Sequence, residues 1–213
     1  MPPKAKFTRE EIVAVAVDII RDSGVEAITA KEIGKRMGTS TRPMFTWFKT
    51  VEELRDAATE EARRIYNGYA ERGISMTPAF KGFGMEYIRF ATEEPSLFRL
   101  LFMRKTEQNS PLEFLGVEGH LPQIREAAMT TFHLDAAQAD WLYENLWIYV
   151  HGIATLCASE ALRFTQEDIS QKLGNLCRGL LMSLKAPKDE RTGLIPGVGT
   201  VVPGSVEDYM KAP

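Results

Sequence analysis

A threonine followed three residues later by a glutamate occurs three times in the first 53 residues of this 213-residue chain. The pairs are Thr8 with Glu11, Thr29 with Glu32, and Thr50 with Glu53. Such a pair can form a capping box, in which the hydroxyl and the carboxylate each accept a backbone N–H of the first helical turn. Apolar residues follow each pair at spacings of three and four, the period of one helical face. The sequence therefore predicts three helices with defined starts in this segment.

Between the second and third of these helices, residues 38–49 have room for only one short helix. Ser40 is expected to cap it, and Pro43 then lies in the first turn, where its missing N–H costs no hydrogen bond. The tight turn before it contains Gly38. Two helices joined in this way predict a helix-turn-helix, whose second helix enters the major groove of DNA by its N-terminal end.

Polar side chains suited to DNA contact lie along this short helix. Ser40, Thr41 and Thr46 offer hydroxyls for phosphates and bases, and Arg42 can present two parallel donors to guanine. Arg42 could instead be a solvated charge at a helix start. Residues 1–50 hold nine Lys/Arg against six Asp/Glu, whereas the remainder holds 17 against 23. This mild asymmetry fits a basic segment that faces a polyanion.

The rest of the chain also has the helical period. Apolar faces predict further helices over about 78–94, 97–103, 118–132, 136–162 and 166–184. Thr77 is expected to cap the first of these, Asp135 the fourth and Thr165 the last. The predicted fold is all-α, with about nine helices, and residues 104–117 are expected to form a loop. Residues 186–213 are rich in Gly, Pro and Val. They form either a disordered tail or, as we slightly prefer, a segment that docks on the body or on a partner subunit through its apolar residues.

The stretch TAKEIGKRMGTSTRPMFTWFKTVEEL, residues 29–54, resembles the DNA-binding domain of the TetR/AcrR transcriptional regulators. The family pattern is T-x-x-x-I-A-x-x-x-G-V-S-x-x-x-L-Y-x-H-F-x-x-K-x-x-L. The chain matches it at Thr29, Ile33, Gly38, Ser40, Phe48 and Leu54. It departs from the pattern at Phe45, Trp47 and Val51, where the family commonly has Tyr, His or Tyr, and Lys.

The resemblance implies that the positions of the departures contact DNA phosphates. Phe45 has no hydroxyl and Val51 no charge, whereas Trp47 keeps one N–H donor. Lys49 is expected to supply the missing cation, together with Lys4 and Lys6 on the N-terminal arm. Thr29 and Pro43 complete the expected DNA-contacting set. Phe48 is expected in the core, Phe45 could lie in the core or face DNA, Trp47 could lie at the solvent edge, and Thr29 could be only a cap.

The resemblance also implies the organisation of the whole chain. Residues 1–52 would be the DNA-binding domain, and residues 53–185 a helical effector-binding and dimerisation domain. The predicted helix around LYENLWIYVHGIATLCA is apolar on more than one side, which is typical of a helix buried on both sides. It could form a homodimer interface with the last helix. The expected function is a repressor that leaves a pseudo-palindromic operator when an effector binds. The alternative to a dimer interface is that these apolar faces form one larger core within a single subunit.

A weaker prediction concerns the effector site. Aromatic side chains with a few polar groups are typical of small-molecule cavities, and an apolar or aromatic effector would suit them. The expected lining is Phe83, Tyr87, Phe90, Phe98, Phe102, Tyr143, Trp147 and His151. Trp147, His151 and Gly152 form a W-x-x-x-H-G run, which resembles one C-terminal subgroup of these regulators. Core packing without a cavity is the alternative.

Several classes of protein are not indicated. Cys157 and Cys177 are the two cysteines and have no C-x-x-C spacing, so neither a disulfide framework nor a zinc site is expected. No signal peptide or membrane span is expected, and the predicted location is the cytoplasm. No catalytic residue, metal or cofactor is predicted. A helical small-molecule-binding or enzymatic protein with a degenerate DNA-reading head is the alternative function.

Overall fold

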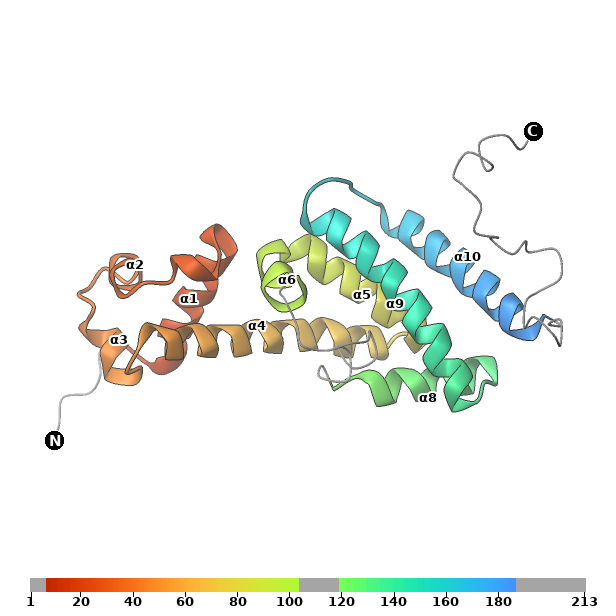
Figure 1. Cartoon of the computed structure of the whole chain (residues 1–213). Helices are drawn as coiled ribbons and strands as arrows, with labels where there is room; N and C mark the ends of the chain where they lie inside the picture. The colour runs from red at the N-terminus through yellow and green to blue at the C-terminus, as the bar shows by residue number, and fades with distance from the viewer. Residues whose placement is uncertain (1–6, 104–118, 187–213) are drawn as a thin grey trace, which may run out of the picture.

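The computed structural model describes residues 7–103 and 119–186, and within these ranges it contains nine α-helices, one short 3-10 helix and no strand (Figure 1). The helices are α1 Arg9–Ser23, α2 Ala30–Arg36, α3 Arg42–Trp47, α4 Val51–Ile74, α5 Ala79–Glu93, α6 Pro95–Phe102, α8 Leu121–Phe132, α9 Ala136–Ala158 and α10 Gln166–Lys185. The all-α prediction is confirmed. The arm lysines Lys4 and Lys6, the predicted loop over 104–117 and the segment 187–213 lie outside the described residues.

The N-terminal helices begin where the threonines predict. Thr8 and Glu11 form a reciprocal capping box at the start of α1. Thr29 and Thr50 each accept the backbone N–H of the residue three positions later, which caps α2 and α4. These caps satisfy N–H groups that have no partner within their own helix. The starts are therefore determined by local sequence.

The helix α4 joins the N-terminal three-helix unit to the remaining helices without a break (Figure 1). Its 24 residues extend over about 36 Å at the usual rise of an α-helix. The expected division between residues 52 and 53 falls within its first turn. Leu54 contributes to the core near α1, whereas Tyr66 is buried among aromatic residues of the body. One continuous helix thus contributes to both cores.

A second connection links α1 to the body. The Arg21 guanidinium donates to both carboxylate oxygens of Glu94, at 2.9 and 2.7 Å, and the Ser96 hydroxyl donates to the Arg21 carbonyl. Arg99 in turn donates to the carbonyl of Ala158, the last residue of α9. Side chains of the α5–α6 junction and of α6 therefore contact both α1 and α9.

Two helix ends differ from the prediction. Thr77 does not cap α5, because Pro78 occupies the N-cap position and Ala79 is the first helical residue. The helix α9 ends at Ala158 rather than near residue 162. Glu160 has a left-handed backbone conformation, with φ of 57°, which is incompatible with continuation of a right-handed helix. The Asp135–Gln138 and Thr165–Asp168 capping boxes at the starts of α9 and α10 are present.

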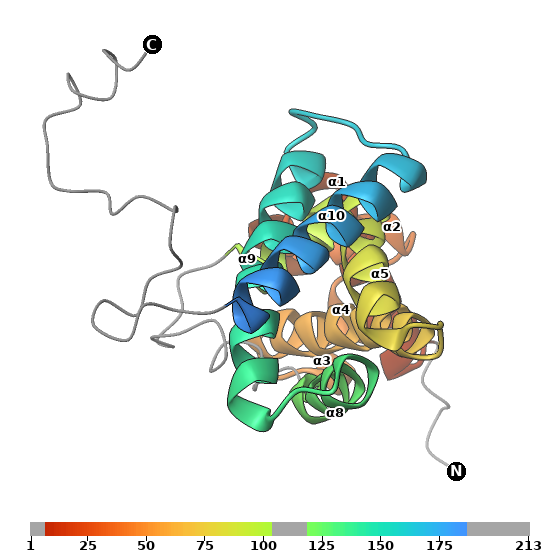
Figure 2. The ribbon, with the colours of Figure 1, turned by 90° about the vertical axis from the view of Figure 1, so that its right-hand side faces the viewer.

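The body consists of α5 packed between α4 and α9, with α8 and α10 covering further sides of α5 and α9 (Figures 1 and 2). Within the two described ranges, no helix is both long and apolar enough to cross a membrane. The same ranges contain no group of three or more His, Cys, Asp or Glu side chains that could hold a metal ion.

Candidate functional site

The turn between α2 and α3 brings the start of α3 directly against α2. Gly38 has a positive φ of 61°, and the Thr39 N–H donates to the Gly34 carbonyl at 2.9 Å. A Cβ on Gly34 would lie 2.9 Å from the Thr39 carbonyl oxygen, closer than side chains normally approach backbone. Glycine at position 34, where the family pattern has alanine, therefore permits this close turn.

The helix α3 begins one residue later than a Ser40 cap implies. Thr41 occupies the N-cap position and makes no side-chain capping bond, while the Ser40 hydroxyl accepts the Arg42 backbone N–H at 3.4 Å. Pro43 lies in the first turn, as expected. Serine 40 thus contributes a weak cap from outside the helix.

Two buried side chains hold α3 on the N-terminal core. Met44 and Phe48 are 1% and 3% exposed, and the Arg9 guanidinium lies 5.1 Å from the centre of the Phe48 ring. The core position of Phe48 is confirmed. Met44 lies on the inner side of α3 and Phe48 follows directly at its C-cap, so the opposite side of α3 faces outward.

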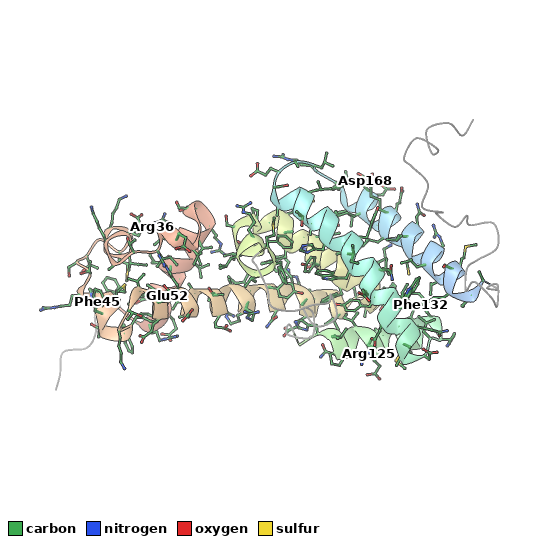
Figure 3. The ribbon with its side chains drawn as sticks, viewed as in Figure 1. Arg36, Phe45, Glu52, Arg125, Phe132 and Asp168 are labelled. Carbon is green, nitrogen blue, oxygen red and sulfur yellow. The ribbon has the colours of Figure 1, made fainter. Side chains whose placement is uncertain are left out.

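The outward side of α3 carries most of the residues expected to contact DNA. Thr41, Arg42, Phe45 and Thr46 are exposed, and Phe45 projects at the end of the molecule farthest from α10 (Figure 3). Phe45 is 51% exposed, so the alternative that it packs in the core is wrong. Arg42 makes no ion pair with any described residue, and its guanidinium is available to a partner.

Trp47 has a different role from the one expected of it. Its indole N–H donates to the Phe7 carbonyl at 2.9 Å, and this hydrogen bond occupies the donor that was expected to reach a phosphate. The bond joins α3 to a residue 40 positions earlier in the chain. It holds Phe7, the first residue that the structure describes, beside α3.

Lys49 and Thr29, which were also expected to contact DNA, are both exposed. The Thr29 hydroxyl accepts the Glu32 backbone N–H at 3.1 Å, so its capping role is present in the structure. The Lys49 backbone N–H donates to Glu53, while its ammonium group forms no ion pair with the part of the chain that is described. Arg36, by contrast, is paired with Asp22 and Glu32.

The predicted effector-site residues form a cluster of touching aromatic rings. Tyr87 lies 5.6 Å from Phe98 and 5.0 Å from Phe102, centre to centre, and Trp147 stacks on His151 at 4.8 Å. Phe90 and Tyr66 of α4 complete the group. Tyr66 was not among the residues that the sequence predicted for this site. Phe83 and Tyr143 lie beside His120 and Phe80 instead.

A side-chain hydrogen bond joins two polar groups of this aromatic cluster. The Tyr87 hydroxyl and His151 Nδ1 are 3.0 Å apart. Burial lowers the pKa of the His151 imidazole below its ordinary value, which favours the neutral ring. A neutral imidazole and a hydroxyl can serve one another as donor and acceptor, so the pair is satisfied within the protein.

A separate cavity of about 240 Å³ lies between α5, α8, α9 and α10. Its apolar side chains include Phe80, Phe132, Leu146, Val150, Leu173 and Leu181. None of the eight aromatic or histidine residues expected to form an effector site lines this cavity. Two glycines, Gly84 and Gly174, contribute to its wall, and an absent side chain gives no signal in the sequence that distinguishes a cavity from a turn or a helix contact.

The helices α9 and α10 expose apolar side chains. Ile148 is 55% and Met182 is 73% exposed, and Trp141, Tyr149 and Leu156 are exposed on the same helix as Ile148. On the same helix, Leu142, Leu146 and Ile153 are buried. The outward stripe of α9 combines residues 141, 148, 149 and 156, which recur at the spacing of one helical face.

These features define a class: an all-helical protein in which a helix-turn-helix unit is joined by one long helix to a separate helical body. Residues 80–178 match the family described as Tetracyclin repressor-like, C-terminal domain. No curated protein matches the chain. This match in the body, with the helix-turn-helix before it, supports a transcription regulator of the TetR family. The subgroup suggested by W-x-x-x-H-G stays a prediction.

Proposed function

We propose that this TetR-family regulator is a homodimeric repressor that reads a pseudo-palindromic operator through α3. The observation that carries the proposal is the outward side of α3, where Arg42 is exposed beside the hydroxyls of Thr41 and Thr46. Arg42 can offer two parallel donors to a guanine edge, and the hydroxyls can contact phosphates or bases. The buried side of α3 is rigidly seated, which favours specific reading over a loose electrostatic contact.

Dimerisation is supported by the exposed apolar stripe on α9 and by Met182 on α10. Apolar side chains gathered on one face of a soluble protein mark interaction surfaces. Two copies joined through these helices would present two copies of α3, and a fixed separation would select one half-site spacing. Sedimentation velocity tests this: Ile148→Glu should shift a dimer to monomers, and an unchanged dimer would contradict the assignment.

An effector that alters the separation of the two reading helices would release the operator. The body provides a cavity with apolar walls for such a molecule, and a small compound with an apolar or aromatic part fits it. Connection to α1 exists through α4 and through the Arg21–Glu94 pair. We therefore place the chain on DNA in the cytoplasm, as a repressor that responds to a ligand.

A gel-shift titration with the DNA upstream of its own gene tests DNA binding. Arg42→Ala should lower specific affinity by about 1–3 kcal/mol and relax preference at one base pair. Arg163→Ala, which removes an exposed charge between α9 and α10, is the matched control and should bind as the wild type does. Equal losses on specific and random DNA would show that Arg42 contacts phosphate rather than a base. No binding by the wild type would favour the alternative of a degenerate reading head.

A further inference from the structure

The cavity of about 240 Å³ has a composition that points to a particular kind of ligand. The helix α10 crosses α5 and α9 here, and α8 lies at one end (Figure 2). Phe132, the last residue of α8, lies at that end (Figure 3). Leu146 and Val150 of α9 form part of the wall. Such a wall offers an alkyl or aromatic group no polar partner and excludes water from it.

Two cations also line this cavity. The Lys81 ammonium donates to the Ser170 hydroxyl at 2.6 Å, and the Arg178 guanidinium donates to the Asn175 side chain. Neither forms an ion pair with a carboxylate in the parts of the chain that are described. Lysine and arginine beside an apolar wall can place their stems along it and direct their charges to its mouth. The uncompensated charges favour an anionic group at that position.

The space itself depends on glycine. A Cβ on Gly174 would have no atom within 4 Å, although Gly174 lies in the middle of α10 and lines the cavity. Glycine is unfavourable inside a helix relative to alanine. On the opposite wall, a Cβ on Gly84 would touch Val150 and Leu173 at 3.4 and 3.5 Å. One wall therefore has room for a side chain that the sequence does not provide.

We propose that this cavity binds an amphipathic carboxylate, with its alkyl chain along the apolar wall and its carboxylate at Lys81 and Arg178. Resting on the proposed function, this assignment makes a medium-chain fatty acid the class of effector. It places the effector in the α5–α8–α9–α10 cavity rather than among the aromatic rings around Tyr87. The charge complementarity distinguishes this ligand from a neutral hydrocarbon of the same size.

Calorimetry with decanoate tests the site on the full chain. Decanoate should bind saturably, and shortening it to octanoate should weaken binding about fourfold per methylene removed. Decanol keeps the chain without the charge and should bind at least tenfold more weakly, while acetate keeps the charge without the chain and should not bind. Equal affinity for decanol and decanoate would overturn the assignment of Lys81 and Arg178.

Gly174→Leu fills the cavity from a position with open space around it, so the fold should tolerate it. It should weaken decanoate binding at least tenfold, whereas Gly174→Ala, the matched control for helix propensity, should stay within threefold of the wild type. A melting temperature at or above the wild-type value shows that the variant is folded. Undiminished binding by folded Gly174→Leu refutes the site. Binding only after removal of residues 187–213 would show that another part of the chain occupies the cavity. Loss of the dimer in Gly174→Leu would show that a second copy occupies it. Either result would also refute the site.

A gel shift separates this inference from the function on which it rests. Decanoate should release operator DNA from the wild type and from Lys81→Arg but not from Gly174→Leu. Binding in the calorimeter without release from DNA overturns the effector role of the cavity. Failure of the wild type to bind any upstream DNA refutes the proposed function, while the calorimetric result still decides whether the cavity binds the carboxylate.

Discussion

Two glycines of α4 should respond to alanine with opposite signs. A Cβ on Gly73 would lie 2.7 Å from both the Gly82 carbonyl oxygen and the Phe83 Cα. These are backbone atoms of α5, which cannot turn aside as a flexible side chain can. On Gly68, five residues earlier, the nearest atom would be the end of the Arg72 side chain, at 4.0 Å.

The magnitudes follow from two opposing terms. Alanine inside a helix is more favourable than glycine by about 0.5–1 kcal/mol, and this term alone applies at Gly68. Overpacking costs about 1–3 kcal/mol, and backbone contacts place Gly73 at the upper end. We therefore expect Gly68→Ala to raise the free energy of unfolding by about 0.5–1 kcal/mol. Gly73→Ala should lower it by about 2–2.5 kcal/mol, which is the upper overpacking cost less the gain in helix propensity.

Urea denaturation followed by circular dichroism measures both changes. The two variants share a helix, a substitution and a gain in propensity, so the difference between them isolates the contact between α4 and α5. If Gly73→Ala were as stable as Gly68→Ala, the two backbones could not be in direct contact, and the close crossing that positions the N-terminal unit relative to the body would be refuted.

Three further predictions concern the reading surface and the body. Lys49→Ala should reduce the salt slope of DNA binding by about one unit, and an unchanged slope would exclude a direct phosphate contact. Trp47→Phe keeps a ring but loses the bond to Phe7, so DNA affinity in a gel shift should fall about two- to tenfold, as expected for one hydrogen bond; wild-type affinity would show that this bond does not matter. Burial lowers the pKa of His151 in the folded chain, so the unfolded chain takes up the proton at a higher pH than the folded chain does. The free energy of unfolding should therefore fall as pH drops below about 6.5. His151→Gln should reduce that pH dependence in urea unfolding between pH 5 and 7, and an unchanged slope would assign it to other groups.

Local signals predicted the helix starts well because each is decided within four residues. Thr8, Asp135 and Thr165 cap the helices that they were expected to cap, since the hydroxyl or carboxylate and the N–H groups that it satisfies are close in sequence. The prediction that Thr77 caps α5 was wrong, because Pro78 occupies the N-cap position. The end of α9 depends on the left-handed backbone at Glu160. Glutamate rarely adopts this conformation, so the sequence did not predict the helix end.

The reading surface was predictable in part. Phe48 was expected in the core and is buried there, and Arg42 and Thr46 are exposed, as the expected DNA contacts require. The partner of Trp47 could not be predicted, because Phe7 is 40 residues away and only the tertiary fold brings its carbonyl within reach. A donor identified from sequence is therefore available to a ligand only if no backbone acceptor of the fold lies beside it.

The effector site shows the same limit in a stronger form. Aromatic residues at helical spacing predicted a pocket, but large flat rings also fill space efficiently, and here Tyr87, Phe98 and Phe102 pack against one another. The cavity lies where side chains are small, at Gly84 and Gly174, on helices far apart in sequence. Hydrophobic residues supply the wall of a binding site, but its volume comes from side chains that are missing where two helices cross. That volume is a property of tertiary packing, and the cations beside it become informative only once the crossing is known.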